Sequence, residues 1–204
     1  MAQEEPQRFS PGPVLKLMPL AMVDPFQYTL HGGVELPIGL TNTIQAEGGW
    51  VFGYLGQAAE TDFTQQGFKL RLSWREYFAP KPVKGNRSRI IQGGYLALMG
   101  SYQHYNQTIE IDTSGGYGYF REYQRSIQGL EGAFLLGYHT QIGQRLSIDV
   151  WGGLGLRYAT HRWSPSKPAF SGLIPRITPV GDLILLPGGR PVPRMGMAIG
   201  WILR

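Results

Sequence analysis

The residues that could carry out chemistry are scattered along this 204-residue chain and form no compact motif. The four histidines, His31, His104, His139 and His161, lie far apart in sequence, so their spacing does not indicate a metal site. There is no cysteine, which excludes a disulfide scaffold, a thiol nucleophile and a thiolate metal site. We therefore expect no metal and no other cofactor.

One set of polar residues has the side-chain types of a hydrolytic or acyl-transfer site: Ser101, His104, Asp112, His161 and Ser164. These residues fall near two long connections and could approach one rim of the fold. A general base must lie within hydrogen-bond distance of the proton that it removes, and the spacing does not fix that geometry. We expect the protein not to be an enzyme, and the alternative is a rim enzyme that acts on lipid or peptide.

Two short motifs are similar to functional motifs but are explained as well by ordinary loop sequence. Ser164 and Lys167 have the S-x-x-K spacing of some acyl-transfer enzymes, but Pro165 and Pro168 favour an extended chain where those enzymes need a helix. The segment 116–120 (GYGYF) is similar to an RNA-binding strand but lacks its leading basic residue. We expect a surface loop there and no nucleic-acid partner.

The composition is unusual for a soluble domain. Charged residues make up 16% of the chain, against about 25% on average, and there are 29 glycines. No apolar run approaches the ~20 residues of a membrane helix. The net charge of +5 is concentrated in irregular connections such as 81–89, and no basic stripe is visible. The mean hydropathy of −0.18 is typical of a soluble protein, but it averages over a regular alternation.

Alternation with a period of two, which is typical of strands, recurs throughout the chain. Between Gly67 and Phe78, one face is apolar (Phe68, Leu70, Leu72, Trp74) and the other is polar (Lys69, Arg71, Ser73, Arg75). Seven more segments alternate similarly: Leu15–Ala21, Tyr28–Leu36, Thr43–Tyr54, Leu96–Gln103, Leu130–His139, Leu146–Tyr158 and Arg194–Leu203. Strands of about ten residues are long enough to cross a bilayer when tilted.

We therefore predict an all-β fold, an eight-stranded antiparallel up-and-down transmembrane β-barrel with a polar, salt-bridged lumen. Residues 1–13 form an N-terminal extension, and residues 14–204 form the barrel. The connections are mostly short and long in turn, with long loops near 104–128 and 160–192. A soluble barrel or sandwich has the same alternation turned inside out, so the pattern alone does not say which face meets lipid.

Aromatic residues near the strand ends favour an apolar outer wall, because aromatic rings gather at the two membrane–water boundaries. The predicted membrane girdle consists of Tyr28, Tyr54, Phe68, Trp74, Tyr138, Tyr158 and Trp201.

Charges of both signs on the polar face favour a sealed lumen, because buried charges need partners. The predicted network of ion pairs comprises Lys16, Glu35, Glu47, Lys69, Arg71, Arg75, Glu131, Asp149 and Arg157. We expect the row Lys69, Arg71 and Arg75 to form a salt-bridged plug with Glu47. If Ile142 pairs with Leu146 across the turn 143–145, Glu131 lies opposite Arg157 and His139 opposite Asp149. Glycines on this face would make room for the long side chains.

Several short segments resemble a family of small outer-membrane proteins of Bacteroidota, catalogued as a domain of unknown function and built as eight-stranded barrels. The similar segments are Leu15–Leu20, Glu35–Pro37, Trp74–Phe78, Gly94–Leu96, and Asp149 with Gly153 and Gly155. The resemblance extends from Val14 to Arg204. It implies a fold and a bacterial outer-membrane location, but it implies no activity and no catalytic residues.

These observations predict a non-enzymatic accessory or structural subunit of a larger outer-membrane complex, such as barrel-assembly, secretion or uptake machinery. The expected partners are outer-membrane lipid and other outer-membrane or periplasmic proteins. The chain shows no signal peptide, and we expect one to have been removed on export. A narrow solute pore is a further alternative.

Overall fold

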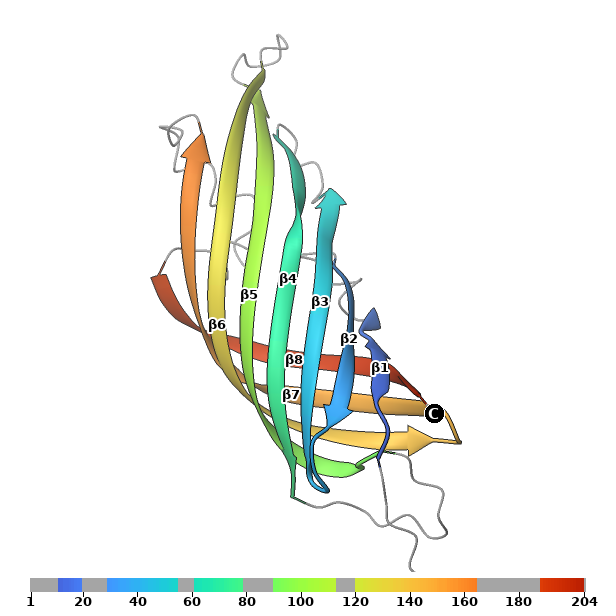
Figure 1. The fold of residues 1–204 in the computed structure, drawn as a ribbon. Coiled ribbons are helices and arrows are strands. Elements are labelled where there is room, and N and C mark those ends of the chain that lie inside the picture. Colours follow the sequence, from blue (N-terminus) through green and yellow to red (C-terminus); the bar gives the residue numbers. More distant parts are fainter. Residues whose placement is uncertain are drawn as a thin grey trace, which may run out of the picture.

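The computed structural model describes residues 11–19, 29–54, 61–78, 90–112, 120–164 and 188–203. They form a closed barrel in which each strand is antiparallel to the next and the last strand pairs with the first (Figure 1). The strands are β1 (Val14–Leu17), β2 (Thr29–Pro37), β3 (Asn42–Tyr54), β4 (Thr61–Tyr77), β5 (Gly93–Asp112), β6 (Phe120–Ile142), β7 (Leu146–Ser164) and β8 (Gly188–Ile202). The predicted eight-stranded up-and-down barrel is confirmed.

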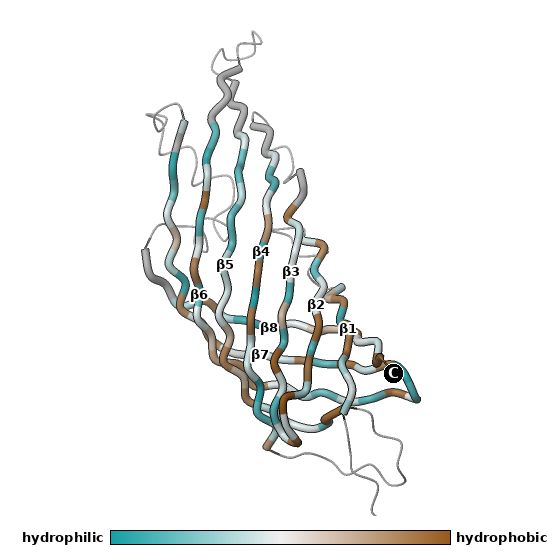
Figure 2. Tube along the Cα trace, in the orientation of Figure 1, coloured by the Kyte–Doolittle hydropathy of each residue, from teal (hydrophilic) through white to brown (hydrophobic). Residues whose placement is uncertain are grey.

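The two faces of the wall are inverted relative to a soluble barrel. On β4, Leu70 and Leu72 are 52% and 59% exposed, whereas Lys69 and Arg75 on the opposite face are 8% and 2% exposed. Figure 2 colours the strands by hydropathy, and apolar and polar residues follow one another along them. A wall that is apolar outside and charged inside is stable only in an apolar surrounding, so the prediction of a transmembrane barrel is confirmed and the soluble alternative is wrong. Within the described ranges, no helix has the length and apolar character needed to cross a bilayer.

The barrel wall is much taller on one side than on the other. β5 and β6 have 20 and 23 residues, whereas β1 has only 4 and pairs with β2 and β8 through those 4 (Figure 1). The long loop expected near 104–128 is therefore wrong in extent, because most of it is paired strand. Outward-facing Asn106 and Gln128 end the apolar alternation, although the backbone pairing continues beyond the apolar band. Similarly, β4 begins before Gly67, β7 continues to Ser164 and β8 begins at Gly188.

The end that holds the chain termini also carries the short turns at 38–41 and 143–145. Gly143 has a φ of 65°, a conformation that glycine adopts without a steric cost, which explains its place in the turn to β7. Ile142 pairs with Leu146 there, as predicted. Ile202 donates a backbone hydrogen bond to Arg145, and Leu203 donates one to Pro13, so the turn, the last strand and the first strand meet at this end.

The interior is filled by side chains, as expected for eight strands. Glycines on the inner face give them room: a Cβ on Gly49 would lie 2.8 Å from the Thr29 side chain, and one on Gly155 would lie 3.0 Å from the Glu131 carboxylate. One apolar group, formed by Val14, Ile90 and Ile202, closes the lumen at the end that holds the termini. A larger one surrounds Tyr77 and Tyr95.

Candidate functional site

Four charged side chains meet inside the barrel near the chain termini, and we call them the terminal cluster: Lys16 of β1, Glu35 of β2, Arg75 of β4 and Asp149 of β7. The Lys16 ammonium lies 2.6 Å from the Asp149 carboxylate and also forms an ion pair with Glu35. The Arg75 guanidinium lies 2.6 Å from Asp149 and 3.3 Å from Glu35. Two cations thus share two carboxylates, and the cluster is neutral.

Neutral polar groups complete the coordination of both carboxylates. Tyr77 and Thr43 donate hydrogen bonds of 2.9 and 2.7 Å to Glu35, and the Tyr95 hydroxyl donates one of 2.7 Å to Asp149. The Arg75 guanidinium also lies over the Tyr95 ring, 4.5 Å from its centroid. Each carboxylate therefore receives hydrogen bonds at both oxygens, which compensates for its removal from water.

The terminal cluster occupies the barrel cross-section and excludes solvent. Lys16, Glu35, Arg75 and Asp149 are 4%, 3%, 2% and 0% exposed. An eight-stranded barrel is just wide enough for side chains to fill. At this level the lumen is a plug of paired charges.

Two further carboxylates hold cations farther from the termini, in what we call the upper lumen. Glu47 lies 3.3 Å from the Arg71 guanidinium, with which it is paired across β3 and β4. Glu131 lies opposite Arg157, as predicted, and their side chains are 3.0 Å apart. Glu131 also forms an ion pair with Arg194 of β8. His139 lies opposite Asp149, as predicted, but its Nδ1 atom lies 3.0 Å from the Tyr77 hydroxyl, which donates its own hydrogen to Glu35.

The prediction that Arg75 joins a plug around Glu47 is wrong. Arg75 is four residues farther along β4 than Arg71, which is about 13 Å in a strand, and it reaches the terminal cluster instead. Lys69 is buried on the inner face of β4 opposite Gly49, at the level of Glu47 and Arg71.

The upper lumen contains more positive than negative charge among the described residues. Its cationic side chains are Lys69, Arg71, Arg125, Arg157 and Arg194, and its carboxylates are Glu47 and Glu131. The terminal cluster is balanced, so the excess counted over the described side chains lies on the side of the barrel away from the termini. Such a charge distribution attracts anions.

The predicted girdle residues that can be placed lie on the outer face. Phe68, Trp74, Tyr138, Tyr158 and Trp201 are between 37% and 58% exposed, at or near the ends of the apolar band. Tyr28 and the side chain of Tyr54 lie outside the described residues.

Those polar residues considered for a rim enzyme whose side chains the structure describes are not brought together. His104 lies on the outer face of β5, 5.9 Å from the Phe68 ring, whereas His161 pairs with buried Ile127 and faces the lumen. Ser101 lies opposite Glu131, well below the rim. The side chain of Asp112, Lys167 and the loop segment 113–119 lie outside the described residues. Within the described part of the chain, no three His, Asp or Glu side chains are grouped as metal ligands would be.

Sequence reasoning missed several participants in the lumen. Tyr77 and Tyr95 bind the carboxylates of the terminal cluster, and Arg125 contacts His161. The parity of the strands could have found the tyrosines, because Tyr77 shares the face of Arg75, two residues away. Arg125 lies in a segment that was expected to be a loop, so its face was not assigned.

A closed strand cylinder with a lipid-facing apolar wall and charges sealed inside defines the class of transmembrane β-barrel proteins. Among solved structures, the chain is similar to CarO of Acinetobacter baumannii, at 12% identity and a TM-score of 0.42, over 98% of this chain and 100% of that one. This distant likeness carries no argument about function. No protein-family model matches the chain, and neither does any curated protein. The resemblance to the Bacteroidota family stays a prediction.

Proposed function

We propose that this protein is a bacterial outer-membrane barrel that does not conduct solutes and acts as an accessory or structural subunit of a larger envelope complex. One observation carries the proposal: the terminal cluster fills the cross-section with paired, solvent-excluded charges. A barrel closed at one level offers its wall and its rims to partners, and it offers no continuous aqueous path.

The placement in the membrane follows the asymmetry of known outer-membrane barrels, which have short turns on the periplasmic side and longer extensions outside the cell. Here the termini and the turns at 38–41 and 143–145 lie at one end, and the tall β5–β6 wall rises at the other. We infer that the terminal cluster lies toward the periplasm and that the upper lumen opens toward the exterior. The resemblance to small Bacteroidota barrels supports the same location.

The proposal is tested first by conductance. We expect the refolded chain in planar bilayers to give no discrete channel steps. The double variant Arg75→Ala, Asp149→Ala is the matched positive control, because it removes one cation and one carboxylate from the plug without changing the net charge. Regular steps from the unmodified chain would favour a narrow solute pore instead.

The subunit role is tested by extraction from native outer membranes in a gentle detergent. We expect the chain to elute with other envelope proteins in fixed proportion, and to give the same species after chemical cross-linking in whole cells. Elution as a free monomer under both conditions would refute the subunit role. A rim enzyme would instead show itself as altered lipid A or peptide composition in the His104→Ala and His161→Ala variants.

A further inference from the structure

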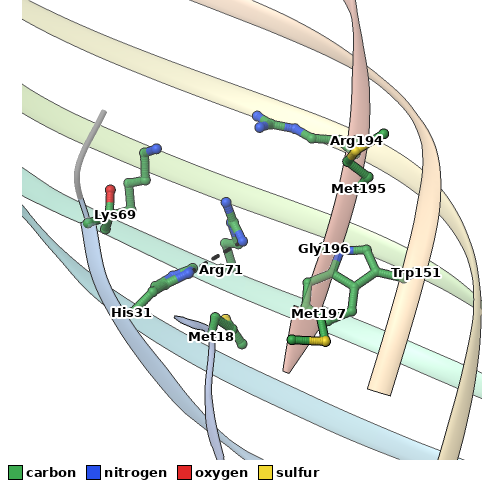
Figure 3. A pocket seen from close by; sticks show the side chains of 10 residues that line it. Met18, His31, Lys69, Arg71, Trp151, Arg194, Met195, Gly196 and Met197 are labelled. Carbon is green, nitrogen blue, oxygen red and sulfur yellow. Dashed lines mark hydrogen bonds between the residues drawn. The ribbon is translucent and has the colours of Figure 1, made fainter. Parts of the chain in front are cut away.

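Within the part of the chain that the structure describes, the β1–β8 seam that closes the barrel spans only part of its height. β8 pairs with β1 only from Ile199 to Ile202, whereas it pairs with β7 along its length from Gly188. Above this seam, within the described residues, β8 faces Met18 and His31 across a cavity of about 120 Å³ (Figure 3). We call this cavity the lateral opening. Its lining includes His31, Lys69, Arg71, Trp151 and Arg194.

The sequence of β8 discourages any strand from extending the seam upward. Ile202 donates its backbone hydrogen bond toward β7 and Leu203 donates toward the N-terminal segment, so odd-numbered residues of β8 point their N–H groups to the seam side. Pro191 and Pro193 are odd-numbered and have no N–H group. Proline in a strand is confined to edges of this kind, and a strand placed here would lose two ladder bonds.

The lateral opening has apolar side chains at its outer edge and cationic side chains inside. Met195 is 87% exposed on the lipid-facing side, and Met197 lies beside it. The interior presents Lys69, Arg71 and Arg194.

The interior also holds a buried imidazole between Arg71 and Glu47. His31 Nδ1 lies 3.5 Å from Arg71 (Figure 3), and His31 Nε2 lies 3.7 Å from the Glu47 carboxylate, beyond hydrogen-bond distance. Arg71 and Arg194 share their carboxylates with other groups, and the side chains that the structure describes in the upper lumen include five cations and two carboxylates.

We propose that the lateral opening binds an anionic amphiphile of the surrounding membrane, a lipid that bears a phosphate group. The phosphate lies among Arg194, Arg71 and Lys69, where its charge offsets the cationic excess. The alkyl chains stay on the outer wall beside Met195 and Met197, so the ligand enters sideways from the bilayer. The proposal depends on the membrane placement of the barrel and is independent of its role as a subunit.

The test uses the full chain in phosphatidylcholine nanodiscs, with Trp151 retained as the sole tryptophan and the other four replaced by Phe. Because Trp151 lines the opening, a bromine-labelled dodecyl phosphate bound there quenches its fluorescence. Bromine-labelled dodecylphosphocholine at the same probe-to-lipid ratio is the control, because it measures the quenching caused only by partition of the probe into the bilayer. The variants are Arg194→Gln and Lys69→Gln, with Arg145→Gln as the matched control, because Arg145 carries the same charge in the distant turn to β7.

We expect saturable quenching by the phosphate probe above the phosphocholine background. Loss of one charge-assisted contact should weaken binding about tenfold in Arg194→Gln and in Lys69→Gln, with no change in Arg145→Gln. Equal quenching by both probes, or unchanged binding in both opening variants while circular dichroism shows them folded, would overturn the proposal. Competition by inorganic phosphate as strong as by unlabelled dodecyl phosphate would also overturn it, because the site would then bind a free anion from the lumen.

Discussion

Replacing Asp149 by asparagine is expected to destabilise the barrel by about 3–5 kcal/mol. The Asp149 carboxylate receives contacts of 2.6 Å from both Lys16 and Arg75 and a hydrogen bond of 2.7 Å from Tyr95. Charge-assisted hydrogen bonds of this kind contribute about 1.5–3 kcal/mol each, and an asparagine amide keeps a single acceptor oxygen. The variant leaves two buried cations with one carboxylate, and this uncompensated charge dominates the cost.

The free energy of unfolding is measured by urea titration of the chain refolded in lipid vesicles, followed by tryptophan fluorescence. The informative control is the double variant Lys16→Met, Asp149→Leu, which removes a cation together with the carboxylate and leaves Arg75 with Glu35. We expect it to recover at least half of the stability lost in Asp149→Asn, because the remaining charges are paired. A cost below about 1 kcal/mol for Asp149→Asn, or a double variant less stable than the single one, would refute the electrostatic account of the plug.

Two further predictions concern the inner and outer faces of the wall. A Cβ on Gly153 would lie 2.9 Å from the backbone Cα of Leu135, so Gly153→Ala should lower the free energy of unfolding by about 1–3 kcal/mol in the same urea titration. A Cβ on Gly132 would have nothing within 4 Å, so Gly132→Ala should be nearly neutral. Equal effects of the two substitutions would contradict the assigned faces. Leu154 is 69% exposed on the apolar band, so Leu154→Arg should cost about 2–4 kcal/mol in a bilayer, while Gln128→Arg, outward but beyond the band, should change stability little. A harmless Leu154→Arg would indicate that this face does not meet lipid.

The alternation of residue types was sufficient to predict the number of strands, their faces and part of the register. The short turn at 143–145 favours a single register of β6 against β7, and this register correctly placed Glu131 opposite Arg157. Where side chains on both faces are polar, as along 104–112 and 120–128, the pattern contains no information about the face. The extensions of β5 and β6 were therefore predicted to be loop.

The sequence alone does not predict which inward-facing side chains contact each other across the lumen. Arg75 and Asp149 are 74 positions apart, and they meet because the tilt and curvature of the barrel bring β4 and β7 to the same level. Strand parity shows that both point inward, but it does not show which inward side chains share a level. The lateral opening has the same origin, since it depends on where β1 ends relative to β8.

The position of Lys16 on the first strand has a consequence for how the barrel folds. Lys16 is on the first strand, and one of its partners, Asp149, is on the seventh, so this ion pair exists only after the two ends of the chain have met. Until then, Lys16 can reach Glu35 on the adjacent β2, but Asp149 lacks this cation and keeps water around it. Ring closure and dehydration of the interior are therefore one event, and an unfinished barrel remains wet inside.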